Sequence, residues 1–176
     1  MVSPEIRPAG PADAPAIAAL HAESWLRTYR GMLSDAYLDG DVHGERSAAW
    51  QQRFAEPRPD QRAWLATADD EPVGFVCLFA DDDPGWGVYV DNLHVRVDQQ
   101  GRGLGRALLA TAAAWTVAER PASGLWLWVL EANHAARAFY GRAGAVEADR
   151  TRADDHGGGT ATAVRCHWPD PRVLLS

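Results

Sequence analysis

Residues 93–109 read LHVRVDQQGRGLGRALL, and within them Gln100-Gly101-Arg102-Gly103-Leu104-Gly105 links a predicted strand to a predicted helix. Glycines at alternate positions permit a sharp turn that directs backbone N–H groups inward. The first turn of the following helix adds unpaired N–H groups and the positive end of its dipole. This stretch therefore predicts a cradle for a diphosphate, with Arg102 and Arg106 beside it.

The spacing of the glycines excludes the common dinucleotide fingerprint. A G-x-G-x-x-G pattern would need its last glycine at position 106 or 108, which hold Arg106 and Leu108. The chain contains no lysine, so it has neither the lysine of a Walker-type phosphate loop nor an amine for a Schiff base. The alternative is a plain strand-to-helix turn in which the glycines serve geometry alone.

Length and composition predict one globular domain over residues 1–176, with 47% hydrophobic and 23% charged residues. A net charge of −7 argues against nucleic-acid binding and is compatible with a cationic substrate or with ordinary solubility. Cys77 and Cys166 form neither a disulfide framework nor a zinc spacing, so we expect no metal site. No apolar run suits a signal peptide or a membrane span, which predicts a cytoplasmic protein without membrane partners.

The hydrophobic periodicity predicts a mixed sheet with helices on its faces, of class α/β (α+β). Predicted strands cover residues 5–8, 63–67, 73–79, 88–97, 125–130, 145–150 and 160–168. Predicted helices open at Pro11–Asp13, run irregularly from Ser34 to about Phe54, and cover 104–119 and 134–141. Residues 154–159 are predicted as a hairpin loop. Within residues 88–97, Val88, Val90, Leu93, Val95 and Val97 are expected on one face.

Two motifs carry a resemblance to a known family. Residues 93–109, with Gln100, Gly103 and Gly105, resemble the acetyl-CoA signature of the GNAT superfamily of N-acetyltransferases. About thirty residues on, NHAARAFYGRAGA (133–145) resembles the family's N-x-x-A-x-x-x-Y-x-x-x-G helix and turn. The resemblance covers essentially the whole chain. It implies about seven mostly antiparallel strands with a central splayed parallel pair, flanked by about four helices.

The resemblance also implies a reaction and a place for acetyl-CoA. Acetyl would pass directly from acetyl-CoA to a primary amine in a ternary complex, with the pantetheine arm between strands 88–97 and 125–130. The alternatives are a non-catalytic acyl-CoA sensor of the same fold, a relative that uses a longer acyl group, and a small nucleotide-binding protein. The implied acetyl-CoA contacts are Val95, Arg96, Val97, Gln100, Gly101, Arg102, Gly103, Leu104, Gly105, Arg106 and Asn133.

Three residues are candidates for the chemistry. Tyr140 matches the family's general acid for the leaving thiolate, and its alternative role is that of a core aromatic beside Phe139. Asp91 lies four residues before Val95, which predicts the same strand face, and some relatives carry a Glu there that takes the amine proton through water. His94 is the other titratable group near neutral pH, and parity predicts that it points to the opposite face. A third option is that no residue serves as a dedicated base.

The acceptor side of this family lies in the first two helices and their connection. Here Trp25 and Tyr29 share one helix face and could wall a pocket, with Glu23 attracting a cation. A hydrophobic core face explains the two aromatic residues equally well. The acceptor is a small-molecule or peptide amine of open identity. A homodimer through the last strands is also open.

Overall fold

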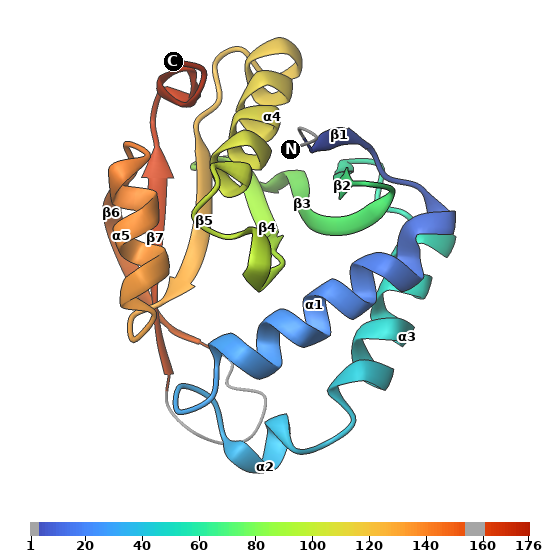
Figure 1. Ribbon diagram of the computed structural model, residues 1–176. Helices are drawn as coiled ribbons and strands as arrows, with labels where there is room; N and C mark the ends of the chain where they lie inside the picture. The colour runs from blue at the N-terminus through green and yellow to red at the C-terminus, as the bar shows by residue number, and fades with distance from the viewer. Residues whose placement is uncertain (1–3, 154–160) are drawn as a thin grey trace.

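The computed structural model describes residues 4–153 and 161–176, and its centre is a seven-stranded mixed sheet (Figure 1). The strand order is β1-β2-β3-β4-β5-β7-β6, in which β4 and β5 are the parallel pair. The strands are β1 (Glu5–Pro8), β2 (Gln61–Ala68), β3 (Glu71–Asp83), β4 (Gly87–Val95), β5 (Leu125–Leu130), β6 (Val146–Ala153) and β7 (Ala161–Trp168). The predicted hairpin loop at 154–159 lies outside the described residues.

Within these residues, five α-helices flank the sheet: α1 (Ala14–Thr28), α2 (Asp35–Leu38), α3 (Val42–Ala55), α4 (Leu104–Glu119) and α5 (His134–Arg142). The single helical stretch predicted from Ser34 to Phe54 is wrong. Ser34 does cap α2, but that helix ends at Leu38, and Asp41 then caps α3 by accepting from the Gly44 backbone N–H at 2.8 Å. In the part of the chain that is described, no helix is both long and apolar enough to cross a bilayer.

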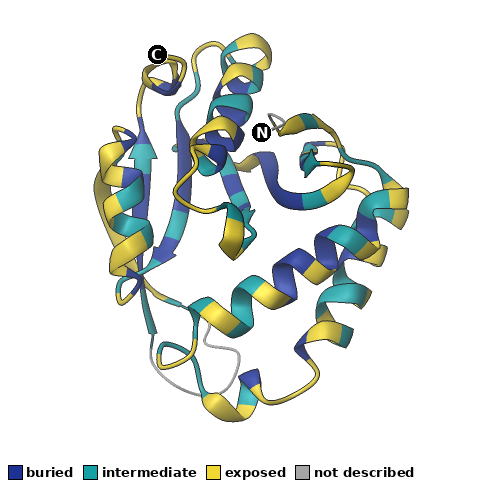
Figure 2. Ribbon diagram, viewed as in Figure 1, coloured by how far each residue is buried: buried dark blue, intermediate teal, exposed yellow. Residues whose placement is uncertain are grey.

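The sheet separates two hydrophobic cores (Figure 2). On one face α1 and α3 pack Ile17 and Trp50 against Phe75 and Cys77 of β3. On the other face α4 and α5 pack against β3, β4, β5 and β7, and this core includes Leu108. The alternation along β3 therefore sorts its odd-numbered residues 75 and 77 to α1 and α3, and residues 76 and 78 to α4.

An extra residue in β4 reverses the alternation in mid-strand. Cys77 pairs with Asn92 and Leu78 pairs with Val90, which leaves Asp91 as the added residue of a β-bulge. Because of the bulge, Val88 and Val90 share one core with Leu93 and Val95, as the sequence predicts. The strand ends at Val95, so the prediction that it continues to Val97 is wrong. Val97 begins a 3-10 turn and is 50% exposed.

The parallel strands β4 and β5 are joined only at their starts. Val88 pairs with Leu125 and Tyr89 with Trp126, and no further pair connects them along Gly87–Val95 and Leu125–Leu130. At the start the backbones are in close contact, because a Cβ on Gly87 (φ +99°) would lie 2.3 Å from the Gly124 carbonyl oxygen. The backbone groups on the facing edges beyond this junction are therefore unpaired with one another, as the predicted splay requires.

Candidate active site

The gap between β4 and β5 opens into a cavity of about 570 Å³. Its walls come from the end of α1, from β4, from the glycine-rich turn, from β5 and from α5. Among its lining residues are Ser24, Thr28, Tyr29, Asp91, Asn92, His94, Val95, Gln100, Gly101, Gly103, Gly105, Arg106, Trp128, Asn133, Tyr140 and Arg142. The two sequence motifs thus meet in one cleft.

The glycine-rich turn has the conformation that a phosphate cradle needs. Gly101 and Gly103 have φ values of +73° and +86°, and Gly103 is the N-cap of α4. Residues with side chains rarely adopt such angles. At Gly105 a Cβ would lie 3.2 Å from the Phe139 ring, so the glycine lets α4 approach α5. The first turn of α4, whose N–H groups have no partner within the helix, therefore fits a diphosphate.

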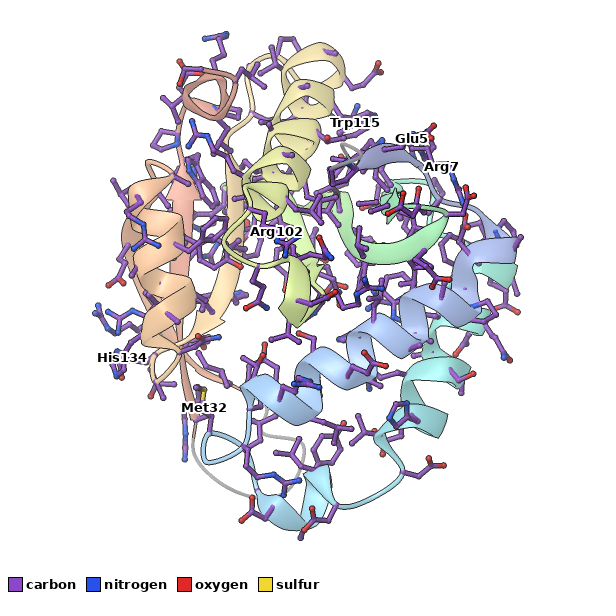
Figure 3. The ribbon with its side chains drawn as sticks, viewed as in Figure 1. Glu5, Arg7, Met32, Arg102, Trp115 and His134 are labelled. Carbon is purple, nitrogen blue, oxygen red and sulfur yellow. The ribbon has the colours of Figure 1, made fainter. Side chains whose placement is uncertain are left out.

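The basic residues of the turn differ in their surroundings. Arg102 is exposed on the connection between β4 and α4 (Figure 3) and does not line the cleft. Arg106 lines the cleft, and its Nη2 donates to the Ser176 carbonyl oxygen at 2.8 Å. Arg142 of α5 is the second guanidinium in the lining, and the sequence did not single it out.

Not all predicted acetyl-CoA contacts line the cleft. Arg96 and Val97 line a second cavity of about 490 Å³ between α1 and the end of β4. Leu104 is 4% exposed, and its side chain belongs to the core under α4, so only its backbone is available to a ligand. Asn133 lines the cleft and also caps α5, since its Oδ1 accepts from the Ala136 N–H at 3.1 Å.

A side-chain hydrogen bond lies at the end of β4, beside the cleft. The Gln100 Nε2 donates to the Val95 carbonyl oxygen at 3.0 Å. The side chain of Gln100 therefore lies across the end of β4, next to the backbone that the family resemblance assigns to the pantetheine arm. The Val95 carbonyl oxygen has a second lone pair that a ligand donor can use beside this amide.

Tyr140 lies at the inner wall of the cleft. It is 9% exposed and stands edge-on to Trp168, with the ring centroids 6.0 Å apart. The Trp168 Nε1 donates to the Ala143 carbonyl at 3.0 Å, which ties the end of α5 to β7. Burial, and secondarily the neighbouring Tyr29 phenol, raises the pKa of Tyr140, so this phenol keeps its proton at neutral pH.

Asp91 points toward α3 rather than sharing the face of Val95, which corrects the sequence prediction. Its Oδ2 lies 2.6 Å from Arg53 Nη1 and also accepts from the Asn92 side chain. The physical reason is the bulge, which adds one residue between Val90 and Val95 and so breaks the simple alternation.

His94 points to the face opposite Val95, as parity predicts, and the bulge places Asp91 on that face with it. Its Nδ1 is 2.8 Å from Ser24 Oγ of α1, and its ring centroid is 4.7 Å from that of His21. Burial lowers the pKa of His94 to about 4, so its imidazole is neutral at physiological pH. Both candidate bases, together with Tyr140, line the same cleft.

The three predicted acceptor residues separate in space. Tyr29 lines the cleft, whereas Glu23 lines the second cavity. Trp25 lines neither cavity. Its ring packs edge-on to His21 and Tyr29, at 5.3 and 5.5 Å, and the Arg46 guanidinium lies 4.7 Å from its centroid. Trp25 therefore supports the wall behind Tyr29 instead of forming it.

Three further residues at the cleft were not found from the sequence. Ser24 and Arg53 reach the site from α1 and α3, 70 and 38 residues away from their partners on β4. Trp128 was predicted only to share a face with Trp126, whose ring centroid lies 6.0 Å from its own. The alternation of large residues in β5 was the available signal for Trp128. No local pattern signals Ser24 or Arg53.

Comparison with known proteins identifies the class of this molecule. Residues 20–145 match the model of the acetyltransferase (GNAT) family. The probable N-acetyltransferase Rv2775 of Mycobacterium tuberculosis is 30% identical over 137 residues, which cover 77% of this chain and 75% of that protein. The chain therefore belongs to the GNAT family and is an acyltransferase, as the two motifs predict.

Two further relatives extend the comparison. The peptidyl-lysine N-acetyltransferase YjaB of Salmonella typhimurium is 34% identical over 100 residues, covering 56% of this chain and 60% of that protein. The crystal structure of PaiA N-acetyltransferase from Thermoplasma acidophilum in complex with coenzyme A is similar in fold, with a TM-score of 0.73. It is 20% identical, and the match covers 93% of this chain and 98% of that chain.

Proposed function

We propose that this protein transfers acetyl from acetyl-CoA to a primary amine in a ternary complex. The observation that carries the proposal is the continuous cleft in which the parted strands β4 and β5 lead to the glycine-rich turn. An extended pantetheine arm matches the first feature, and a diphosphate matches the second. Nucleotides without such an arm would use only one of the two features.

The acetyl-CoA contacts that fit this cleft are a subset of those predicted. Val95 and Gln100 lie at the end of β4, and Gly101, Gly103 and Arg106 surround the start of α4. The Val95 N–H is the proposed donor to the thioester oxygen, where a fixed donor stabilises developing negative charge. Bound acetyl-CoA supplies the activated acyl group, and the protein aligns it with the amine.

Tyr140 is the proposed general acid. Its raised pKa keeps the phenol protonated at neutral pH, and a protonated phenol in the cleft wall can donate to a leaving thiolate. Direct transfer is favoured over a cysteine intermediate, because burial raises the pKa of Cys77 to about 12 and that of Cys166 to about 11. Neither thiol is a thiolate nucleophile at neutral pH.

The proposed acceptor is a small-molecule or peptide amine, and the proposed location is the cytoplasm. One relative is named as a peptidyl-lysine N-acetyltransferase, which makes a lysine side chain one reasonable acceptor. The net charge of −7 favours cationic acceptors through long-range attraction. Tyr29 and Trp128 give the acceptor end of the cleft two aromatic walls.

The experiment is a thiol-release assay with acetyl-CoA and three amine probes: spermidine, kanamycin and a blocked peptide that contains one lysine. We expect release of CoA that depends on one of these amines, together with the acetylated amine by mass spectrometry. Acetyl-CoA binding in calorimetry without turnover on any amine would favour the non-catalytic sensor. Failure to bind acetyl-CoA would contradict the proposal entirely.

A further inference from the structure

Four side chains form a connected polar chain beside the cleft. Ser24 Oγ lies 2.8 Å from His94 Nδ1, the His94 ring lies against His21, and Trp50 Nε1 is 3.0 Å from His21 Nδ1. An indole N–H can only donate, so His21 Nδ1 must be unprotonated and accept. His21 is 4% exposed and Trp50 1%, so this end of the chain is held in the core.

The open end of the chain is Ser24. It is half-buried, it lies on α1 where the helix crosses β4, and it lines both cavities. When its hydroxyl donates to His94 Nδ1, its lone pairs remain available to accept an N–H from a molecule in the cleft. The sequence alone gave no reason to select this residue.

Asp91 is less suited to receive the proton of the acceptor. One of its carboxylate oxygens, Oδ2, takes both the Arg53 guanidinium, at 2.6 Å, and the Asn92 amide. The Arg53 group also lies 4.9 Å from the Trp50 ring centroid and is therefore anchored on α3. A proton delivered to this oxygen would have to compete with both of these donors.

On the basis of the proposed function, we propose that Ser24 receives the proton of the acceptor amine and passes its own hydroxyl proton to His94 Nδ1. Ser24 is then a catalytic residue, and His21 is a positioning residue that acts through the His94 ring.

Every proton and bond in this step can be followed from reactants to products. The amine nitrogen forms its bond to the acyl carbon and the C–S bond breaks. One N–H proton moves to Ser24 Oγ as the Ser24 hydroxyl proton moves to His94, which becomes imidazolium. The Tyr140 phenol supplies a proton to the thiolate. Release of the His94 proton to water and return of a proton to Tyr140 restore the starting state.

The surroundings of His94 favour rapid return to the neutral imidazole. From α1 it faces His21, on which the guanidinium groups of Arg46 and Arg53 from α3 act. Asp91, on the other side of Asn92 in β4, is held by Arg53. A buried imidazolium among these groups readily loses its proton, since burial disfavours the charged ring.

The test compares Ser24→Ala, Ser24→Thr, His94→Asn and the double variant Ser24→Ala/His94→Asn. The assay uses saturating acetyl-CoA and whichever of spermidine, kanamycin or the lysine peptide the unmodified protein acetylates fastest. Removing an acid–base group should lower kcat about 100-fold in Ser24→Ala. Ser24→Thr keeps the hydroxyl and should recover most of the rate. Ser47→Ala, which removes a hydroxyl bonded to Gln51 on α3, is the matched control and should keep the full rate.

Two readouts separate proton transfer from a structural effect. If the pair works as one unit, the double variant should be no slower than His94→Asn alone, because effects within a unit are not additive. The acetyl-CoA affinity and the unfolding midpoint of Ser24→Ala should stay unchanged. A Ser24→Ala enzyme with unchanged kcat, or single losses that simply multiply, would overturn the inference while leaving the transferase function intact. If the unmodified protein acetylates none of the three amines, both proposals fail.

Discussion

The guanidinium of Arg53 lies 2.6 Å from the carboxylate of Asp91, and this ion pair joins α3 to the bulge of β4. The two side chains are 32% and 19% exposed, so the pair is only partly shielded from water. Through this ion pair, Asp91 holds the bulge of β4 against α3 and so has a structural role. The bulge that it secures also keeps Val88 and Val90 in the same core as Leu93 and Val95.

Replacement of Asp91 by Asn should therefore weaken folding more than it alters the acidic limb of the pH–rate profile. We expect a loss of about 1–2 kcal/mol in the free energy of unfolding, because Arg53 stays half-buried without its partner. Urea denaturation and a pH–rate profile on the same protein measure both effects. A profile that loses its acidic limb in Asp91→Asn would instead make Asp91 the base.

Replacement of Tyr140 by Phe tests the general acid. The substitution removes one hydroxyl and keeps the edge-on contact with Trp168. We expect kcat to fall by about 10²–10⁴-fold, the usual range for an acid–base group. Acetyl-CoA affinity, measured by calorimetry, should hardly change. A normal rate would remove Tyr140 from the chemistry.

A pair of glycine substitutions tests the packing behind the phosphate cradle. In Gly105→Ala the new methyl would lie 3.2 Å from Phe139 and should push α4 from α5, at a cost of about 1–3 kcal/mol and with weaker acetyl-CoA binding. Gly141 lies in α5, where an added methyl group would meet no atom within 4 Å. There, Gly141→Ala should stabilise the protein by about 0.5–1 kcal/mol. Thermal unfolding and calorimetry of both variants give the comparison, and equal behaviour would contradict the close packing at Gly105.

Arg165 accounts for a group of tryptophans that the sequence left unexplained. Its guanidinium lies 4.3, 4.3 and 4.5 Å from the ring centroids of Trp86, Trp126 and Trp128, and its side chain is 9% exposed. A lysine ammonium group is not planar and cannot stack on the indole rings. The variant Arg165→Lys should therefore lose about 1–3 kcal/mol in the free energy of unfolding and shift the tryptophan fluorescence.

The control for Arg165 is Arg172→Lys, at a side chain that is 61% exposed. An exposed ion pair contributes little, and we expect a change within about 0.5 kcal/mol. Denaturant unfolding followed by fluorescence measures both variants. Equal stability of the two variants would show that stacking of Arg165 on the three indole rings contributes nothing to the free energy of unfolding.

Acid should destabilise the fold before its carboxylates are protonated. Burial lowers the pKa of His94 to about 4 and also lowers that of His21, whereas the unfolded chain has values near 6.5. Between those values the unfolded state binds more protons, so the free energy of unfolding falls as pH drops from 6.5. Each histidine adds a slope of about 1.4 kcal/mol per pH unit within its window. Urea unfolding at pH 7.5, 6.0 and 5.0 measures the slope, which should be smaller in His94→Asn. A pH-independent stability in this range would contradict the neutral buried pair.

Elements were predicted correctly from the sequence where the pattern that defines them lies within the element itself. Helix α4 and strand β5 have the predicted bounds, because an amphipathic period and a continuous apolar run are local properties. The break between α2 and α3 was missed, although Gly40 and the capping residue Asp41 mark it. Apolar spacing alone does not reveal a short kinked connection.

In the site, too, residues in contiguous motifs were predicted, and residues that the fold brings together were not. The glycine-rich turn and Tyr140 belong to contiguous motifs and were predicted to share the site they line. The shift of apolar positions from Val90 to Leu93 already indicated the bulge, yet Asp91 was assigned to the face of Val95 by simple alternation without it. Contacts such as Ser24 with His94 depend on how α1 crosses the sheet, which no local pattern contains.

The most direct test of the central claim is thermal unfolding with acetyl-CoA, CoA or NAD, one ligand at a time. A ligand that binds only the folded protein stabilises it by about 2.7 kcal/mol at 100 times its Kd. We predict a midpoint raised by several degrees with acetyl-CoA and with CoA, and unchanged with NAD. An unchanged midpoint with both CoA species at millimolar concentration would contradict the assignment of the cleft between β4 and β5.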